Sequence, residues 1–320
     1  MSRRVARFAL ALPLLAGVLS LISSVDVGAQ TATPPPAASE RTVVVLPASG
    51  IVDSVLAGYL DGGITQAQRD GAAAVVIRLN TPGGSLDATQ RIVSSVLEAP
   101  LPVIVWVAPS GARAASAGTF ITLAGHVAVM APGTNIGAAS PVGGSGEDIE
   151  GTLGQKVLND AIASIRSIAE TRGRNVEWAE ATVRDARSSP ASEALAEGAI
   201  DGLAGSIDEV VAFADGREVT VRGDSVTIAT AGAQVSELEM NPAQQLLHLL
   251  SDPNIAFILF TIGFYGLLYE VISPNFVTGI IGALAIILAF IGFGSLPLNV
   301  AGLLLIGLSV VLFVLELTVA

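Results

Sequence analysis

Three long apolar runs close this chain of 320 residues, and they restrict its fold more than any other feature. The runs cover approximately residues 254–272, 276–294 and 298–318, and residues 223–320 contain neither Lys nor Arg. A helix needs about 20 apolar residues to cross about 30 Å of hydrocarbon. Buried helices of soluble domains rarely come as three successive runs with breaks of only a few residues. We therefore expect a transmembrane region of three helices over residues 253–320, and so a multi-pass protein of the cell membrane that contacts lipid.

The N-terminus has the pattern of a secretory signal peptide. Several Arg residues precede an apolar segment over residues 8–22, and small residues at 27–29 offer a cleavage site. We predict a signal peptide over residues 1–29 and a flexible Pro/Ala-rich leader over residues 30–40, with an uncleaved anchor helix as the alternative. Cleavage would place the following domain outside the cytoplasm, and the first transmembrane helix would cross inward.

Residues 41–232 have the pattern of a separate α/β enzyme domain. Short apolar runs, typical of buried strands, alternate with stretches of helical period. This alternation predicts a mainly parallel sheet with helices on both faces. The predicted strands are residues 42–46, 74–79, 103–107 and 127–130. The predicted helices include residues 54–70, 85–97 and 152–172. We also predict a short helix with Ser189 as N-cap and a terminal hairpin over residues 219–228.

A linker over residues 233–252 is expected to join this domain to the membrane region. Residues 241–250 cluster leucines, which predicts a short amphipathic helix at the membrane interface. His248 lies in this helix, where we expect it to pack rather than to catalyse. Glu270 and Glu316 lie near the ends of the apolar runs, where a carboxylate can reach the lipid headgroups.

The composition excludes several classes of function. The net charge of −12 argues against a nucleic-acid partner, which requires basic clusters. The lack of Cys excludes a cysteine nucleophile, a thiolate metal site and disulfides. The sequence contains no metal-ligand pattern and no phosphate-binding loop of the P-loop type. We therefore expect neither a metal nor a cofactor.

Small residues follow two of the predicted strands, at the edge of a parallel sheet where ligands bind. Gly83 and Gly84 come after the strand at 74–79, and they would let the backbone approach a ligand. A tight strand–helix turn would explain the same glycines. A run of tiny residues after the strand at 103–107 is expected to open a helix with Ser116 in its first turn, although close helix packing would also use such residues. The run is not a G-x-S-x-G elbow, because Ala114 replaces the first glycine.

The basic residues indicate how a serine could be activated. They comprise 15 Arg and one Lys, Lys156. A lysine in a dry apolar site can lose its proton and act as a general base, which arginine cannot do, although a single lysine can also be an accident of composition. His126 begins a strand at the end opposite the expected site, and His248 lies close to the membrane. A dyad of Ser116 and Lys156 is the remaining arrangement. The backbone N–H groups expected to hold an oxyanion belong to Gly83, Gly84 and Ala117.

Three segments together resemble the ClpP-class membrane-bound serine proteases, the long form of the NfeD family. They are LNTPGGSLDATQRIV at 79–93, PSGARAASAGTFI at 109–121 and APGTNIGAASPV at 131–142; the spacing of Lys156 ahead of residues 167–175 and the segment LLSDPN at 249–254 also fit. The resemblance covers roughly residues 41–320. The order and spacing of the motifs are more specific than any one of them.

The resemblance implies a ClpP/crotonase-like fold and endopeptidase activity, with Ser116 as nucleophile, Lys156 as general base and the oxyanion positions named above. It also implies a homo-oligomer, a dimer or larger, which cleaves apolar segments of stomatin-like membrane proteins. Long forms of the family continue into a small OB-like barrel. Because this sequence stops at Ala320 after the third run, we expect a fragment, a truncated gene product or a shorter variant.

Two functions therefore remain at this point. The first is a membrane-anchored serine endopeptidase that cleaves apolar or juxtamembrane segments. The second is a non-proteolytic membrane scaffold, in which the α/β domain binds partners and Ser116 only packs. An acyl-CoA enzyme on the same fold is disfavoured by the signal peptide, since CoA is cytoplasmic.

Overall fold

The computed structural model describes residues 41–143 and 146–294, together with residues 302, 304, 305 and 307–309. The predicted signal peptide and leader lie outside the described residues, as does most of the third apolar run, Glu316 included.

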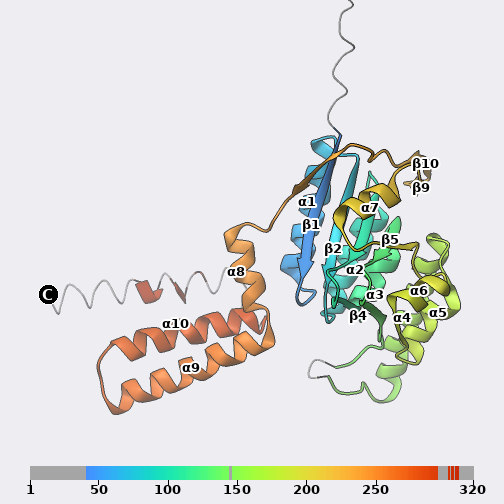
Figure 1. The fold of residues 1–320 in the computed structure, drawn as a ribbon. Coiled ribbons are helices and arrows are strands. Elements are labelled where there is room, and N and C mark those ends of the chain that lie inside the picture. Colours follow the sequence, from blue (N-terminus) through green and yellow to red (C-terminus); the bar gives the residue numbers. More distant parts are fainter. Residues whose placement is uncertain (1–40, 144–145, 295–301, 303, 306, 310–320) are drawn as a thin grey trace, which may run out of the picture. The chain divides into compact units, whose positions relative to one another are not determined.

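A six-stranded parallel sheet forms the centre of the domain (Figure 1). Its order is β11-β1-β2-β3-β5-β8. The strands are β1 (Thr42–Ser49), β2 (Ala74–Asn80), β3 (Val103–Val107), β5 (Val127–Met130), β8 (Gly202–Leu203) and β11 (Gln234–Glu237). The four predicted strands are confirmed, and each is apolar because a parallel sheet is covered on both faces.

Helices cover the two faces of this sheet. Alternate side chains of β1 enter different cores: Val44 and Leu46 join the larger one, and Val43 and Val45 the smaller one. The larger core includes α1 (Ser54–Arg69), α2 (Leu86–Leu97), α3 (Ala117–Ala124), α4 (Gly151–Thr171), α5 (Val176–Arg184) and α6 (Ala191–Ala196), and the smaller one includes α7 (Ile207–Ala214). The mixed α/β class with a parallel sheet is therefore confirmed.

A second, three-stranded sheet was not predicted. It joins β4 (Arg113–Ala115), β6 (Asn135–Gly137) and β7 (Ser188–Pro190). The run of tiny residues is thus a strand before it becomes a helix, which begins only at Ala117. Ser189 lies in β7 and is not the predicted N-cap, because its hydroxyl donates to Glu193 at 2.7 Å and accepts from the Trp178 indole at 3.2 Å.

The chain between the hairpin and the apolar helices is more than a linker. The predicted hairpin is confirmed as β9 (Glu218–Val221) and β10 (Asp224–Thr227). After it, β11 pairs in parallel with β1 at the sheet edge, and the Tyr59 hydroxyl donates to the Leu238 carbonyl at 2.6 Å. Part of the segment assigned to the linker therefore belongs to the sheet.

The predicted interfacial helix is α8 (Pro242–Leu250), and His248 fastens it to the domain. One ring nitrogen of His248 lies 3.0 Å from Asp53 Oδ2 and the other lies 2.9 Å from the Ser49 carbonyl oxygen. Both partners are acceptors, so the imidazolium form satisfies both contacts. Asp53 also caps α1, accepting from the Leu56 N–H at 2.7 Å.

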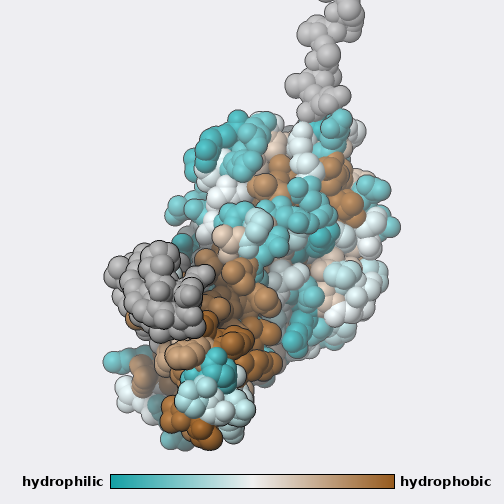
Figure 2. All heavy atoms as spheres, turned by 90° about the vertical axis from the view of Figure 1, so that its left-hand side faces the viewer, coloured by the Kyte–Doolittle hydropathy of each residue, from teal (hydrophilic) through white to brown (hydrophobic). Residues whose placement is uncertain are grey.

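Two apolar helices follow. α9 (Pro253–Ile272) has 20 residues and is long and apolar enough to cross a membrane, whereas α10 (Val277–Gly292) is shorter. Gly263 and Gly266 face Gly282 closely, which lets the two backbones approach. Large exposed apolar side chains such as Phe257, Tyr265 and Val271 lie on α9. Figure 2 shows apolar surface, in brown, gathered in the lower part of the view.

The carboxylate of Glu270 caps α10. Its carboxylate accepts from the backbone N–H groups of Asn275, Phe276 and Gly279 and from the Thr278 hydroxyl, at 2.7–3.0 Å. A carboxylate at a helix N-terminus satisfies donors that the helix itself leaves free. These bonds give Glu270 a structural role in the turn between α9 and α10, and the expectation that it can reach lipid headgroups stays a prediction.

The His248–Asp53 contact should make stability depend on pH. The hydrogen bond to Asp53 raises the pKa of His248 despite its burial, and its stabilising contribution is complete below about pH 6.5 and lost as pH rises through the raised pKa. Burial raises the pKa of Asp53, but hydrogen bonds from His248 and the Leu56 N–H outweigh it and lower this pKa. The aspartate contribution is therefore complete above about pH 4 and lost in more acidic solution.

We expect the free energy of unfolding to fall by about 1–2 kcal/mol between pH 6 and pH 9 in detergent, measured by denaturant titration. His248→Asn should flatten this slope. Asp53→Asn is the matched variant, because asparagine keeps the N-cap but removes the charge. An unchanged slope in both variants would show that the pair does not hold α8.

Candidate active site

The glycine loop after β2 is held in place by backbone hydrogen bonds on both sides. The Thr81 N–H donates to the Arg113 carbonyl at 2.8 Å, and the Ala115 N–H donates to the Thr81 carbonyl at 3.1 Å. On the other side, the Val52 N–H donates to the Gly83 carbonyl at 2.9 Å. The loop is therefore fixed between the segment that opens α1 and the strand that leads to Ser116.

Ser116 stands on a sharp strand-to-helix turn. It follows β4, precedes α3 and has a φ of 51°, a left-handed conformation that is unusual for serine. Its N–H donates to the Gly137 carbonyl at 3.0 Å, and its carbonyl accepts from the Thr119 N–H at 2.9 Å. Its hydroxyl makes no hydrogen bond to another described residue. The surroundings thus hold a strained backbone and leave the oxygen free, which is typical of functional positions.

Gly83 provides the space next to this serine. A Cβ atom on Gly83 would lie 2.8 Å from Ser116 Cβ and 3.2 Å from Ser116 Oγ, and its φ is 119°. Any larger residue would therefore meet the serine side chain and adopt a backbone conformation that L-residues avoid. The two loops predicted from the sequence do come together here.

The hydrogen bonds divide the three expected oxyanion donors into two kinds. The Gly83 N–H donates to Thr81 Oγ1 at 3.0 Å, so it is already engaged. The N–H groups of Gly84 and Ala117 have no acceptor among the described residues. Gly84 precedes the N-cap of α2, and Ala117 is the first residue of α3, so both N–H groups lie at helix N-termini, which favour negative charge.

Lys156 lies in the second turn of α4 and is exposed. Within residues 41–143 and 146–294 it forms no ion pair and no hydrogen bond, to Ser116 or to any other residue. The dry surroundings that a lysine base requires are therefore not supplied by the described residues of a single copy. Leu153, one turn earlier on α4, is 65% exposed, so apolar surface borders the lysine.

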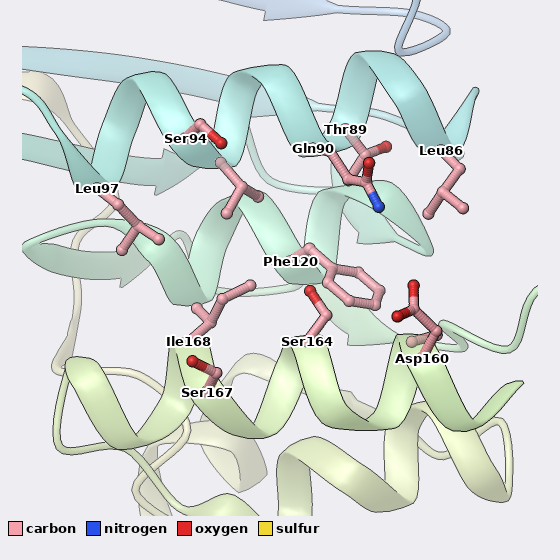
Figure 3. A pocket seen from close by; sticks show the side chains of 12 residues that line it. Leu86, Thr89, Gln90, Ser94, Leu97, Phe120, Asp160, Ser164, Ser167 and Ile168 are labelled. Carbon is pink, nitrogen blue, oxygen red and sulfur yellow. The ribbon is translucent and has the colours of Figure 1, made fainter. Parts of the chain in front are cut away.

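A groove of about 360 Å³ runs between α2 and α4 (Figure 3). Leu86 and Leu97 come from α2, Asp160 and Ile168 come from α4, and Phe120 of α3 lies between the two helices. The groove is lined by both apolar and polar side chains. It is large enough for one or two amino-acid side chains.

One end of the groove adjoins the residues singled out above. Leu86 lies two residues after Gly84, Phe120 lies one turn after Ser116, and Asp160 lies one turn after Lys156. All three therefore mark the same end of the groove. A chain segment lying in the groove would reach the turn at Ser116.

Two threonines that were not predicted as site residues, Thr81 and Thr119, support this turn. The Thr119 hydroxyl donates to the Ala114 and Gly137 carbonyls, at 3.0 and 3.1 Å, and joins β4, α3 and β6. Thr81 engages the Gly83 N–H. Thr81 stood within the quoted glycine motif, where a hydroxyl two residues before a glycine could have indicated a local turn. Thr119 gave no such signal, because its contact with Gly137 joins segments that are 18 residues apart.

Gly83→Ala should destabilise the domain more than Gly111→Ala. Gly111 has a positive φ of 87°, but a Cβ there meets nothing within 4 Å, so its substitution measures the cost of the backbone conformation alone. The additional contact with Ser116 should cost about 1–3 kcal/mol in the free energy of unfolding, measured in urea. Equal losses in the two variants would mean that Gly83 and Ser116 are not in contact.

Two family models match the chain. Residues 42–238 match the NfeD1b N-terminal domain, and residues 254–320 match the NfeD integral membrane domain. The membrane-bound protease PH1510 of Pyrococcus horikoshii is 38% identical over 287 residues, which cover 88% of this chain and 65% of that protein. Membrane protein NfeD1b of Bacillus subtilis is 30% identical over 287 residues, with 87% and 62% covered. The chain thus spans slightly less than two thirds of each relative.

Solved structures of a related protease domain have the same fold. The 1510-N membrane-bound stomatin-specific protease, as a lysine-to-alanine mutant in complex with a substrate peptide, is 35% identical with a TM-score of 0.63, and the match covers 67% of this chain and 99% of that one. A serine-to-alanine mutant of the same protease is 36% identical with a TM-score of 0.60, covering 63% and 100%. With both family models matched in sequence order, the chain belongs to the NfeD family, as an NfeD1b-type domain followed by the NfeD integral membrane domain.

Proposed function

We propose that the chain is a membrane-bound serine endopeptidase with Ser116 as nucleophile and Lys156 as general base. The observation that carries this proposal is the free hydroxyl of Ser116 on its left-handed turn, beside a glycine loop and two unengaged N–H groups. The similarity to a protease whose structures include serine and lysine mutants supports the same assignment.

In the proposed reaction, Ser116 Oγ attacks the carbonyl carbon of the peptide bond while the neutral Lys156 amine accepts the hydroxyl proton. The negative oxygen of the tetrahedral intermediate accepts hydrogen bonds from the N–H groups of Gly84 and Ala117. Gly83 supplies space rather than a donor. The lysine then returns the proton to the departing amine, which leaves an acyl-enzyme. A water molecule, deprotonated by the same lysine, hydrolyses this ester and frees Ser116.

The exposure of Lys156 suggests that the substrate completes the site. An amine in water stays protonated near neutral pH, whereas burial under apolar atoms favours its neutral form. A substrate segment lying in the groove would cover the lysine together with Leu153. A second copy of the chain could contribute to the same cover, which fits the expected homo-oligomer of two or more copies.

Apolar or juxtamembrane segments are the proposed substrate class. The groove offers Leu86, Phe120 and Ile168, and α8 joins the domain closely to the apolar helix α9. The related structures are named for a stomatin-specific protease, so stomatin-like membrane proteins are the first substrates to test. The proposed setting is a multi-pass protein whose protease domain, over residues 41–232, lies outside the cytoplasm after removal of a signal peptide.

A membrane scaffold remains the alternative function. It would use the same fold for binding and would need neither a free serine hydroxyl nor the lone lysine. The left-handed turn at Ser116 favours the enzyme, because a packing serine has no need of a strained backbone.

Ser116→Ala should abolish cleavage of apolar peptides by the full chain in detergent, and Lys156→Arg should lower kcat/KM by about 10²–10⁴-fold, since arginine stays protonated. Ser110→Ala is the matched control, because Ser110 is exposed in the segment just before β4. This variant should cleave the peptides normally. Undiminished cleavage by the Ser116 variant would leave the scaffold as the better account.

Ser164→Trp should fill the groove, because Ser164 of α4 points into it (Figure 3). We expect kcat/KM for an apolar peptide to fall at least about tenfold, while a small fluorophosphonate still labels Ser116. Ala163→Trp on the exposed side of α4 is the control. If both variants cleave alike, the substrate does not lie in this groove.

A further inference from the structure

A second cavity, of about 350 Å³, lies at the beginning of β5, at the end of the sheet opposite the Ser116 turn. The loop before β5, the end of α4 and strand β9 enclose it. Figure 1 shows the β9–β10 hairpin far from β4. The proposed protease chemistry uses none of these residues.

His126 lines this cavity and has a donor without an acceptor among the described residues. The residue is only 8% exposed, and its Nδ1 accepts from the Val103 N–H at 3.1 Å. Burial and the charge of Arg172 lower the pKa of His126 to about 3, so the ring is neutral and its proton lies on Nε2. Nε2 is buried and has no hydrogen-bond partner among the described residues.

Arg172 presents a second such donor. Its Nε donates to the Ala124 carbonyl at 2.8 Å, and Nη1 donates to the Thr220 carbonyl at 3.3 Å. Nη2 is buried and, like His126 Nε2, lacks a partner in the described part of the chain. Burial and the neighbouring Arg174 lower the pKa of Arg172 to about 10, which leaves it a cation at neutral pH.

The other charged groups leave the cavity positive. Arg217 also lines it and lies 3.7 Å above the Phe213 ring. Of the two lining carboxylates, Asp201 is engaged by Arg174 at 2.9 Å and by the Ala128 N–H at 2.6 Å, and Glu218 is exposed on β9. Arg172 and Arg217 therefore outweigh the one carboxylate that is left, Glu218.

Buried donors in folded proteins nearly always have a partner, because an unpaired donor keeps its full desolvation cost. Here the two donors belong to His126 and Arg172, which line one cavity together with the guanidinium group of Arg217. A water molecule could accept from both but carries no charge to balance the arginines. A carboxylate or phosphate offers several acceptor oxygens and the negative charge together.

We propose that this cavity binds a small oxyanion, a carboxylate or a phosphate group, between His126 Nε2, Arg172 Nη2 and Arg217. Arg172 also ends α4, which carries Lys156, and holds the last carbonyl of α3, whose N-cap is Ser116. The bound anion would thus stiffen the junction of the two helices that carry the proposed dyad. The binding itself does not depend on the proposed protease activity.

The test is titration calorimetry of the full chain in detergent with inorganic phosphate and, separately, with acetate, against chloride at equal ionic strength. We expect saturable binding of at least one of the two. Phosphate alone would indicate a phosphate ester as the natural ligand, acetate alone a carboxylate, and both the shared oxyanion chemistry.

His126→Asn keeps an acceptor for the Val103 N–H but removes the Nε2 donor, and Arg172→Gln removes the cation. Each should weaken binding at least about tenfold. Arg217→Gln changes an exposed side chain and should weaken binding about fivefold even if the buried variants fail to fold. Arg166→Gln on the outer face of α4 is the matched control and should bind normally, as should Ser116→Ala, which separates this test from that of protease activity.

Lack of saturable binding of either anion by the wild-type chain would overturn the proposal. Unchanged affinity in Arg217→Gln and in whichever of the two buried variants folds would mean an adventitious ion only, and would overturn it as well.

Discussion

The hydrogen bonds between the end of β2 and strand β4 are the constraint on which the rest of the site depends. Thr81 pairs with Arg113 and Ala115 through its backbone, and Ser116 follows directly. These bonds join a small sheet to the carboxyl edge of the large one. They bring together a glycine loop and a serine that are separated along the chain by a helix, α2, and two strands, β3 and β4. These bonds hold Gly83 and Ser116 next to each other.

Helices α3 and α4 extend this arrangement across the domain. Ser116 is the N-cap of α3, and Lys156 lies in the second turn of α4. The ends of the two helices are joined by arginines that bind the carbonyls of Leu123, Ala124 and Gly125. Cations at a helix C-terminus interact favourably with its dipole. The groove between α2 and α4 therefore has a defined width, since α3 lies between them. A change at one end of these helices has a direct physical route to the other.

Much of the fold could be predicted from the sequence because its signals are local. The buried strands could be predicted because they are short apolar runs. The apolar helix α9 could be predicted because its apolar run is long enough to cross a membrane. Strand β11 was missed because Gln234–Glu237 is polar and exposed, and only its pairing with β1 makes it a strand. The three-stranded sheet was missed for the same reason: each of its strands has only three residues, which pair with distant segments of the chain.

The sequence by itself determined the division into an α/β domain and an apolar region, the family, and the residue types available for chemistry. It could do so because composition, periodicity and motif order are properties of the sequence alone. The tertiary structure decided which groups meet. It engaged the Gly83 N–H with Thr81, turned His248 toward Asp53, and left His126 Nε2 without a partner among the described residues. Hydrogen bonding and burial are properties of neighbours in space, and no spacing along the chain specifies them.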